Sequence, residues 1–229
     1  MKKQIVLFIG LLFSTGVNAQ NFNTSQEKMD QSRNILGIVN RLAYNKDGKN
    51  APQGSPYLNK VFLPATVNGI NASMRYNAYR DEFEFIDAKR DTLVLNKMDQ
   101  YNSITFATVA NQYRLVEFSN KGELTKGYLI ALFEKNNFAL FKRQAVVLIP
   151  EKLAANAYES DRPASYVKAE DTFYFKNGEK GIIEFPSNKK GLIKLFPEKK
   201  VEIENFFKQN KIDFDKEADL VKIIDFLAV

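Results

Sequence analysis

The sequence predicts an α+β fold in which a β-rich antiparallel meander, either a curved sheet or a partly open barrel, is covered by an N-terminal helix and a C-terminal helical segment. Three observations predict it. Apolar residues recur with a period of two between residues 57 and 149, where polar turns separate short runs. From residue 189 onward they recur at helical spacing instead. With 229 residues and 45% hydrophobic content, the chain can bury a core without disulfides or metal.

Residues 1–19 have the pattern of a signal peptide. Lys2 and Lys3 precede the apolar run 5–13, and small residues at 17–19 form a cleavage site. The run is shorter than the roughly 20 residues of a membrane span, so an uncleaved anchor is the weaker alternative. We therefore expect an exported protein, in the periplasm or on the periplasmic face of the outer membrane, whose mature chain has no transmembrane segment.

Residues 20–56 are expected to form the N-terminal helix and a linker. Apolar residues at loose helical spacing predict a helix over 25–43, and Gly, Pro, Asn and Lys gather in the loop 45–55. The stripe of that helix consists of Met29, Ile35, Leu36, Val39 and Leu42.

The β-rich domain with its C-terminal helices covers residues 57–229. Alternation is strictest in 82–86, where Phe83 and Phe85 share one strand face and Glu82 and Glu84 the other. The remaining strands are predicted at 61–68, 72–79, 91–97, 103–109, 112–118, 126–134, 137–143 and 145–149.

Residues 150–168 are predicted to be a connection with one helical turn at 151–157, and a sub-boundary of the domain near 150–168 stays open. Two further strands follow at 171–176 and 181–186. Asn177 and Gly178 lie between them, and Asn-Gly is a strong hairpin signal.

Three helices are predicted at the end of the chain. Asn188 caps the first, 189–195, and Pro197 starts the second, 197–209. Asp215 caps the third, 216–227. The predicted inner face of the second helix is Val201, Ile203, Phe206 and Phe207, and that of the third is Leu220, Ile223, Ile224 and Leu227.

Composition excludes several classes of chemistry. The chain has no histidine and no cysteine, which rules out Ser-His-Asp triads, Cys-His dyads, zinc fingers and iron–sulfur clusters. Phosphate-binding glycine motifs are absent from it as well. The net charge of +6 comes from intermixed acids and bases, unlike a nucleic-acid footprint. We therefore expect neither an enzyme, nor a cofactor, nor a nucleic-acid partner.

The densest cluster of arginine and aromatic residues lies at residues 75–82. Tyrosine and arginine often dominate protein interfaces, so this cluster is the candidate binding surface of an accessory protein. The competing interpretation is a half-buried strand whose arginines pair with Asp81 and Glu82. The interface candidates are Arg75, Tyr76, Asn77, Tyr79 and Arg80.

Two alternative functions stay open. Strands that are apolar on both faces, such as 128–133, could enclose a lipid or another hydrophobic ligand. Glu82 and Glu84 have a spacing near that of a retaining glycosidase, which would make the protein an envelope glycan hydrolase. A solvated strand is the simpler explanation of both carboxylates.

Several short motifs carry a family resemblance. They are Gly54–Asn59 (GSPYLN), Met74–Asn77 (MRYN), Arg162–Tyr166 (RPASY) and Phe206–Lys211 (FFKQNK). With these motifs the chain resembles a poorly characterised family of exported envelope proteins of Bacteroidota. The resemblance implies an address in the cell envelope and assigns no catalytic residue. With the interface candidates above, we expect the partner to be an envelope protein or an outer-membrane complex. Asp91-Thr92-Leu93 resembles the O-glycosylation acceptor of that phylum, which makes Thr92 a candidate modification site.

Overall fold

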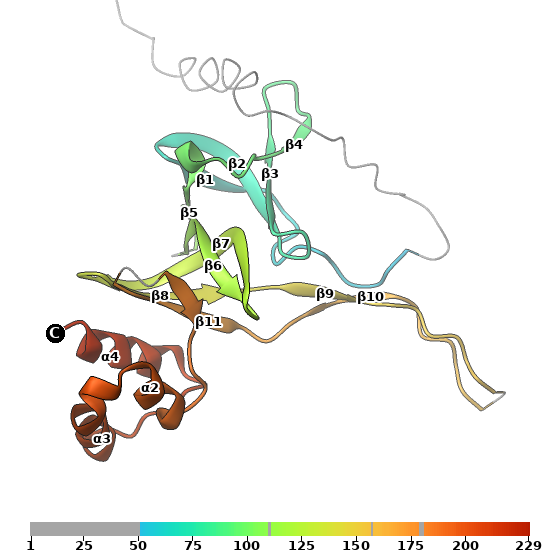
Figure 1. Cartoon of the computed structure of the whole chain (residues 1–229). Helices are drawn as coiled ribbons and strands as arrows, with labels where there is room; N and C mark the ends of the chain where they lie inside the picture. Colours follow the sequence, from blue (N-terminus) through green and yellow to red (C-terminus); the bar gives the residue numbers. More distant parts are fainter. Residues whose placement is uncertain (1–50, 110, 157, 179–180) are drawn as a thin grey trace, which may run out of the picture.

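The computed structural model describes residues 51–229 apart from 110, 157 and 179–180. The predicted signal peptide, and the helix predicted at 25–43, lie outside these residues. The described part is β-rich with helices at its C-terminal end, as the sequence predicts (Figure 1). No helix in it is long and apolar enough to cross a membrane.

Ten strands form one large sheet in the order β12-β11-β8-β7-β6-β5-β1-β2-β3-β4. Their bounds are β1 (Leu63–Val67), β2 (Ile70–Asn77), β3 (Glu82–Ile86), β4 (Thr92–Val94), β5 (Ser103–Phe106), β6 (Gln112–Asn120), β7 (Glu123–Lys135), β8 (Phe138–Arg143), β11 (Thr172–Asn177) and β12 (Ile182–Glu184). A single 3-10 turn, η1 (Asp99–Tyr101), precedes β5.

One end of the sheet closes into a barrel-like ring of β6, β7, β8, β11 and β12. The closing contact is parallel, because Ile182 of β12 pairs with Phe118 of β6. The simple antiparallel meander is therefore corrected in two places: this parallel closure, and the insertion of β1 between β5 and β2. Large side chains, among them Phe118, Phe141 and Tyr174, fill the ring.

The other end of the sheet curls around an aromatic core. Phe83 of β3 meets Tyr128 of β7 edge-on, with ring centroids 4.7 Å apart. Tyr113 of β6 lies 5.0 Å from the same phenylalanine, in the same geometry. β6 and β7 therefore contribute side chains to this core as well as to the ring.

Helices cover the outside of the ring, and their bounds are α2 (Lys189–Leu195), η2 (Pro197–Lys199), α3 (Lys200–Gln209) and α4 (Glu217–Leu227). α4 packs on β7 and β8.

Two predictions about these helices are confirmed: the Asn188 side chain caps α2 by accepting from the Gly191 amide, and the whole predicted stripe of α4 is buried. The N-cap of α4 is Lys216 rather than Asp215, and Val201 is 68% exposed, so these two predictions are wrong. Asp213 and Asp219 organise the turn before α4 instead, since the Asp219 carboxylate accepts from the Asp213 amide.

β9 (Val146–Ile149) and β10 (Ser165–Lys168) form a separate antiparallel ribbon, here called the arm together with the loop that joins them. Figure 1 shows the arm projecting from the side of the sheet. The prediction of a helical turn at 151–157 is wrong: none of the described residues there is helical, and Lys152 instead bridges to Arg162. The local spacing fits a helical turn, but the amides of Lys152 and Ala154 bond instead to Arg162 and Asp161, on the returning side of the loop.

Candidate interaction surface

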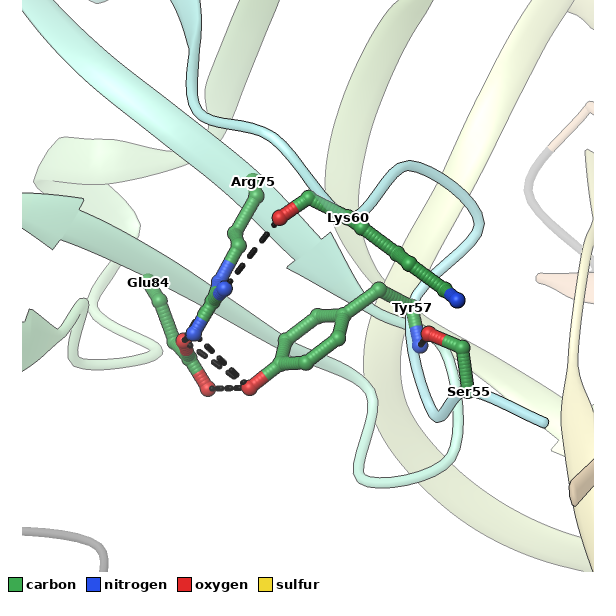
Figure 2. A network of polar contacts seen from close by, with 5 residues as sticks. All are labelled: Ser55, Tyr57, Lys60, Arg75 and Glu84. Atoms are coloured by element: carbon green, nitrogen blue, oxygen red, sulfur yellow. Dashed lines mark hydrogen bonds and ion pairs between the residues drawn. The ribbon is translucent and has the colours of Figure 1, made fainter. Parts of the chain in front are cut away.

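Arg75 lies at the centre of a polar network between β2, β3 and the segment before β1 (Figure 2). Its Nη2 and Nε donate to Glu84 Oε2 at 2.6 and 2.8 Å. The Tyr57 hydroxyl accepts from Arg75 Nη2 and donates to Glu84 Oε1, both at 2.9 Å. Arg75 Nη1 also donates to the Lys60 carbonyl at 3.2 Å. The guanidinium stacks over the Tyr57 ring, 3.9 Å from its centroid.

This network holds a connecting segment rather than presenting a charge to a partner. The Glu84 side chain is fully buried, and only 20% of the Arg75 side chain is exposed. The strand register places the two residues directly opposite each other. The prediction that an arginine of this cluster pairs with a carboxylate is thus confirmed for Arg75. Its partner, however, is Glu84 instead of Asp81 or Glu82.

Tyr76 and Asn77 lie inside the protein, so neither presents a side chain to the surface. Tyr76 is 4% exposed and its hydroxyl donates to Asp81 Oδ1 at 2.5 Å. Asn77 is fully buried and its Oδ1 accepts from the Arg80 amide, which fixes the β2–β3 turn. Their assignment to an interface is therefore wrong. At this end of β2 the residues on both faces of the strand are buried, so alternation along the strand does not predict an exposed side chain.

Asp81 anchors this turn to β7. Its carboxylate receives Lys97 Nζ at 2.6 Å and the Tyr128 amide at 3.2 Å. Burial raises the pKa of Tyr76 well above its usual value, and the Asp81 carboxylate beside the hydroxyl raises it further. A Cβ at Gly127 would come within 2.5 Å of Asp81 Oδ2, so only glycine leaves room for the carboxylate.

Tyr79 and Arg80 are exposed, as an interface requires. Tyr79 is 43% exposed and its ring meets that of Tyr166 on β10, with centroids 5.2 Å apart. The β2–β3 turn therefore contacts the base of the arm. Thr92 is also exposed, at the start of the edge strand β4, where its modification stays a prediction.

The arm has one buried and one exposed face near its base. Residues opposite each other in the register share a face, and successive residues alternate between faces. Val146 and Tyr166 pack against the aromatic core, where Val146 is buried, and Leu148 on the same face is 36% exposed. The opposite face, here called the outer face, consists of Val147, Ile149 and Val167, which are 46%, 48% and 42% exposed.

The far part of the arm also exposes large side chains. Leu153 is 66% exposed and Tyr158 is 100% exposed. Residues 146–168 contain three acidic and three basic residues, so the arm carries no net charge. The sequence patterns at residues 75–82 do not predict this surface. Its available signal was the apolar run 146–149 together with Tyr166 and Val167, both strong β-formers.

The two carboxylates of the hydrolase hypothesis, Glu82 and Glu84, both lie on β3. Glu84 is committed to Arg75 and Tyr57, and the three cavities described below are lined by neither Glu82 nor Glu84. Within the described residues, no group of three or more acidic side chains is placed to hold a metal ion.

Three cavities among the described residues are open grooves rather than enclosed apolar chambers. The largest of these three, about 780 Å³, lies between the segment 168–173, β12 and the start of α4. Five carboxylates line it beside one lysine and a few apolar side chains. A second, of about 500 Å³, adjoins it at residues 211–219. A third, of about 260 Å³, lies beside Arg75.

No family model, curated protein or solved structure matches the chain. The resemblance to exported Bacteroidota proteins therefore stays a prediction.

Proposed function

We propose that the protein is a non-enzymatic accessory protein of the bacterial cell envelope that binds an envelope protein through its arm. The observation that carries the proposal is the exposure of large apolar side chains on a projecting ribbon. Leu153 and Tyr158 are exposed at 66% and 100%, and neither is needed to fill a core. Exposed apolar side chains that gather on one element are typical of interaction sites.

The adjoining turn supports the same surface. Tyr79 and Arg80 are exposed, and Tyr79 contacts Tyr166 at the base of the arm. Tyrosine and arginine supply many of the residues that dominate binding energy. The proposed interface therefore consists of Tyr79, Arg80, Leu153 and Tyr158.

Two observations favour this function over its alternatives. The ring and the curled sheet are filled by their own aromatic side chains, which leaves little room for a carried lipid. Glu84, one of the two carboxylates of the hydrolase hypothesis, is held by an arginine and a tyrosine.

The test is comparative purification from the native envelope in mild detergent. Tagged wild-type protein, the variant Leu153→Ser/Tyr158→Ser and the control Leu124→Ser are each purified, and bound proteins and lipids are identified by mass spectrometry. Leu124 is 77% exposed in the β6–β7 hairpin, away from the arm. We expect a stoichiometric partner whose recovery falls at least about tenfold in the arm variant only, as for interface hot spots.

Equal recovery of every protein in all three samples would overturn the proposal. A bound lipid that co-purifies without any protein would favour the carrier function instead. Circular dichroism of each variant checks that the fold is retained, as expected for substitutions at exposed positions.

A further inference from the structure

The groove beside Arg75, here called the small groove, is lined mainly by apolar and aromatic residues. Its volume is about 260 Å³, and its walls come from the segment 58–63, β2, residues 106–113 and Gln144. These segments are far apart in sequence and meet where the sheet curls around the aromatic core. Apolar walls with a few polar groups are typical of small-molecule sites.

The inner wall of the small groove belongs to the aromatic core. Met74, Phe106 and Tyr113 line the groove and are buried. The Tyr113 ring lies 5.1 Å from the ring of Tyr76 and 6.0 Å from that of Phe106, measured between centroids. Because close-packed rings hold one another in place, this wall does not collapse to fill the groove, and the site is preformed.

Two β-branched side chains are exposed at the opening of the small groove. Val61 and Val109 line it, yet they are 59% and 42% exposed. A molecule bound in the groove would remove part of this apolar surface from water. Binding is favoured in proportion to the apolar area that is covered.

The charges around the small groove favour a neutral ligand. Arg75 is the one charged residue among the described residues that line it. Its guanidinium is already paired with the fully buried Glu84 carboxylate at 2.6 Å. An anion would have to compete with Glu84, and a cation would meet no carboxylate in the wall. Because a buried charge without a partner is costly, an ionic ligand is disfavoured.

Two amide side chains provide the polar contacts of the small groove. Asn59 Oδ1 accepts from the Val61 amide at 3.2 Å, and Gln144 Nε2 donates to Asp171 Oδ2 at 3.4 Å. Within the described residues, these bonds leave the Asn59 Nδ2 donor and the Gln144 Oε1 acceptor for a ligand.

The volume of the small groove limits the size of its ligand. An apolar cavity of about 150 Å³ is known to bind benzene. The small groove, at about 260 Å³, therefore has room for one substituted ring or two fused rings. It is too small for a lipid with complete acyl chains.

We propose that the small groove binds a neutral aromatic molecule of one substituted ring or two fused rings. The ligand packs on Met74, Phe106 and Tyr113, where aromatic rings and a thioether sulfur make favourable contacts with a ring. Its polar group forms a hydrogen bond with Asn59 or Gln144. The lining residues include none of the arm, so this inference does not depend on the proposed function.

Methionine methyl NMR tests the binding, with indole as the probe. Indole is neutral, has two fused rings and carries one N–H donor. The chain has four methionines, of which Met74 lines the groove and Met98 does not. We expect a saturable shift of the Met74 methyl signal alone, with a dissociation constant below about 1 mM, as small ligands can reach. An absent or non-saturable shift at Met74, or an equal shift at Met98, overturns the proposal.

A matched pair of variants locates the bound indole. Val61→Phe narrows the opening of the groove, whereas Leu124→Phe introduces the same ring at an exposed position of the β6–β7 hairpin. Both substitutions are at exposed positions, and circular dichroism checks that the fold is retained. We expect indole to bind at least about fivefold more weakly to Val61→Phe only, because the added ring occupies its space. Equal affinities would place indole elsewhere and contradict the proposal.

Two further probes test the polar contact and the preference for a neutral ligand. N-methylindole lacks the N–H that Gln144 Oε1 would accept, so we expect it to bind about three- to tenfold more weakly than indole. Gln144→Leu should remove that difference, and an unchanged difference would contradict the hydrogen bond. Indoleacetate adds a carboxylate and should bind at least about tenfold more weakly than indole. Tighter binding of indoleacetate would mean that Arg75 receives an anion, which would overturn the neutral ligand.

Discussion

Arg75 and Glu84 illustrate how a single ion pair fixes the segment that leads into the sheet. Replacing Arg75 by methionine keeps most of the apolar stem but leaves a fully buried carboxylate without its cation. Loss of one partner of a buried pair typically costs about 3–5 kcal/mol. We expect Arg75→Met to lower the free energy of unfolding by about that amount in urea titrations.

The matched control for Arg75→Met is Lys126→Met. Lys126 pairs with Asp99, whose side chain is 90% exposed, so its loss should cost less than about 1 kcal/mol. Equal losses in the two variants would contradict a structural role for the Arg75 network.

Replacement by phenylalanine should affect the free energy of unfolding differently at two buried tyrosines. The Tyr128 hydroxyl is buried and has no hydrogen-bond partner among the described residues, whereas that of Tyr76 donates to the Asp81 carboxylate. We expect Tyr128→Phe to leave the free energy of unfolding unchanged or to raise it by about 1 kcal/mol. Tyr76→Phe should lower it by about 1.5–3 kcal/mol. Urea unfolding at pH 7 measures both, and a similar loss in each would mean that Tyr128 has a partner.

At the scale of single residues, the sequence predicted chemistry better than location. It predicted that the arginines of residues 75–82 either pair with acids or form an interface. Arg75 follows the first alternative, while Tyr79 and Arg80 stay exposed. The burial of Tyr76 and Asn77 could not be predicted, because it depends on β6 and β7 folding back over β2.

At the scale of elements, the ends of the C-terminal helices offer a contrast between two predicted caps. Asn188 Oδ1 accepts from the Gly191 amide at 2.9 Å, whereas the Asp215 side chain does not cap α4. We expect Asn188→Ala to cost about 1 kcal/mol, the usual value of an N-cap, and Asp215→Ala to cost much less. Thermal unfolding of both variants distinguishes these values, and equal losses would contradict the assignment.

Elements with local hydrogen bonds were predicted well, and elements with distant partners were not. The helix 189–195 and the buried stripe of α4 follow from spacing and capping within a few residues. β10 and the parallel contact between β12 and β6 depend on partners far along the chain. A single sequence does not encode such pairings in any short window.

At the scale of the whole molecule, the buried tyrosines of the aromatic core make the free energy of unfolding fall at alkaline pH. Burial raises the pKa of Tyr113 to about 12, above the value of about 10 expected in the unfolded chain. Its contribution is therefore complete below pH 10 and is lost as the pH rises toward 12. The shift corresponds to about 2–3 kcal/mol. Tyr76 and Tyr128 shift in the same direction.

We expect the free energy of unfolding to fall between pH 10 and pH 12, and Tyr113→Phe to flatten that fall. Urea titrations at half-unit pH intervals measure it. Tyr158→Phe is the control, because the side chain of Tyr158 is fully exposed and should leave the pH profile unchanged. A profile that is identical in wild type and Tyr113→Phe would show that other groups cause the fall.

Because Ile182 pairs with Phe118, the ring cannot close until the residues around 182 have been synthesised. A ribosome that has released β6 through β8 has exposed a strand edge whose partner is still untranslated. Unpaired strand edges invite association with other chains, and distant pairings form slowly. The nascent protein is thus most vulnerable to aggregation until the segment around residue 182 emerges, and a chaperone would be most useful in that interval.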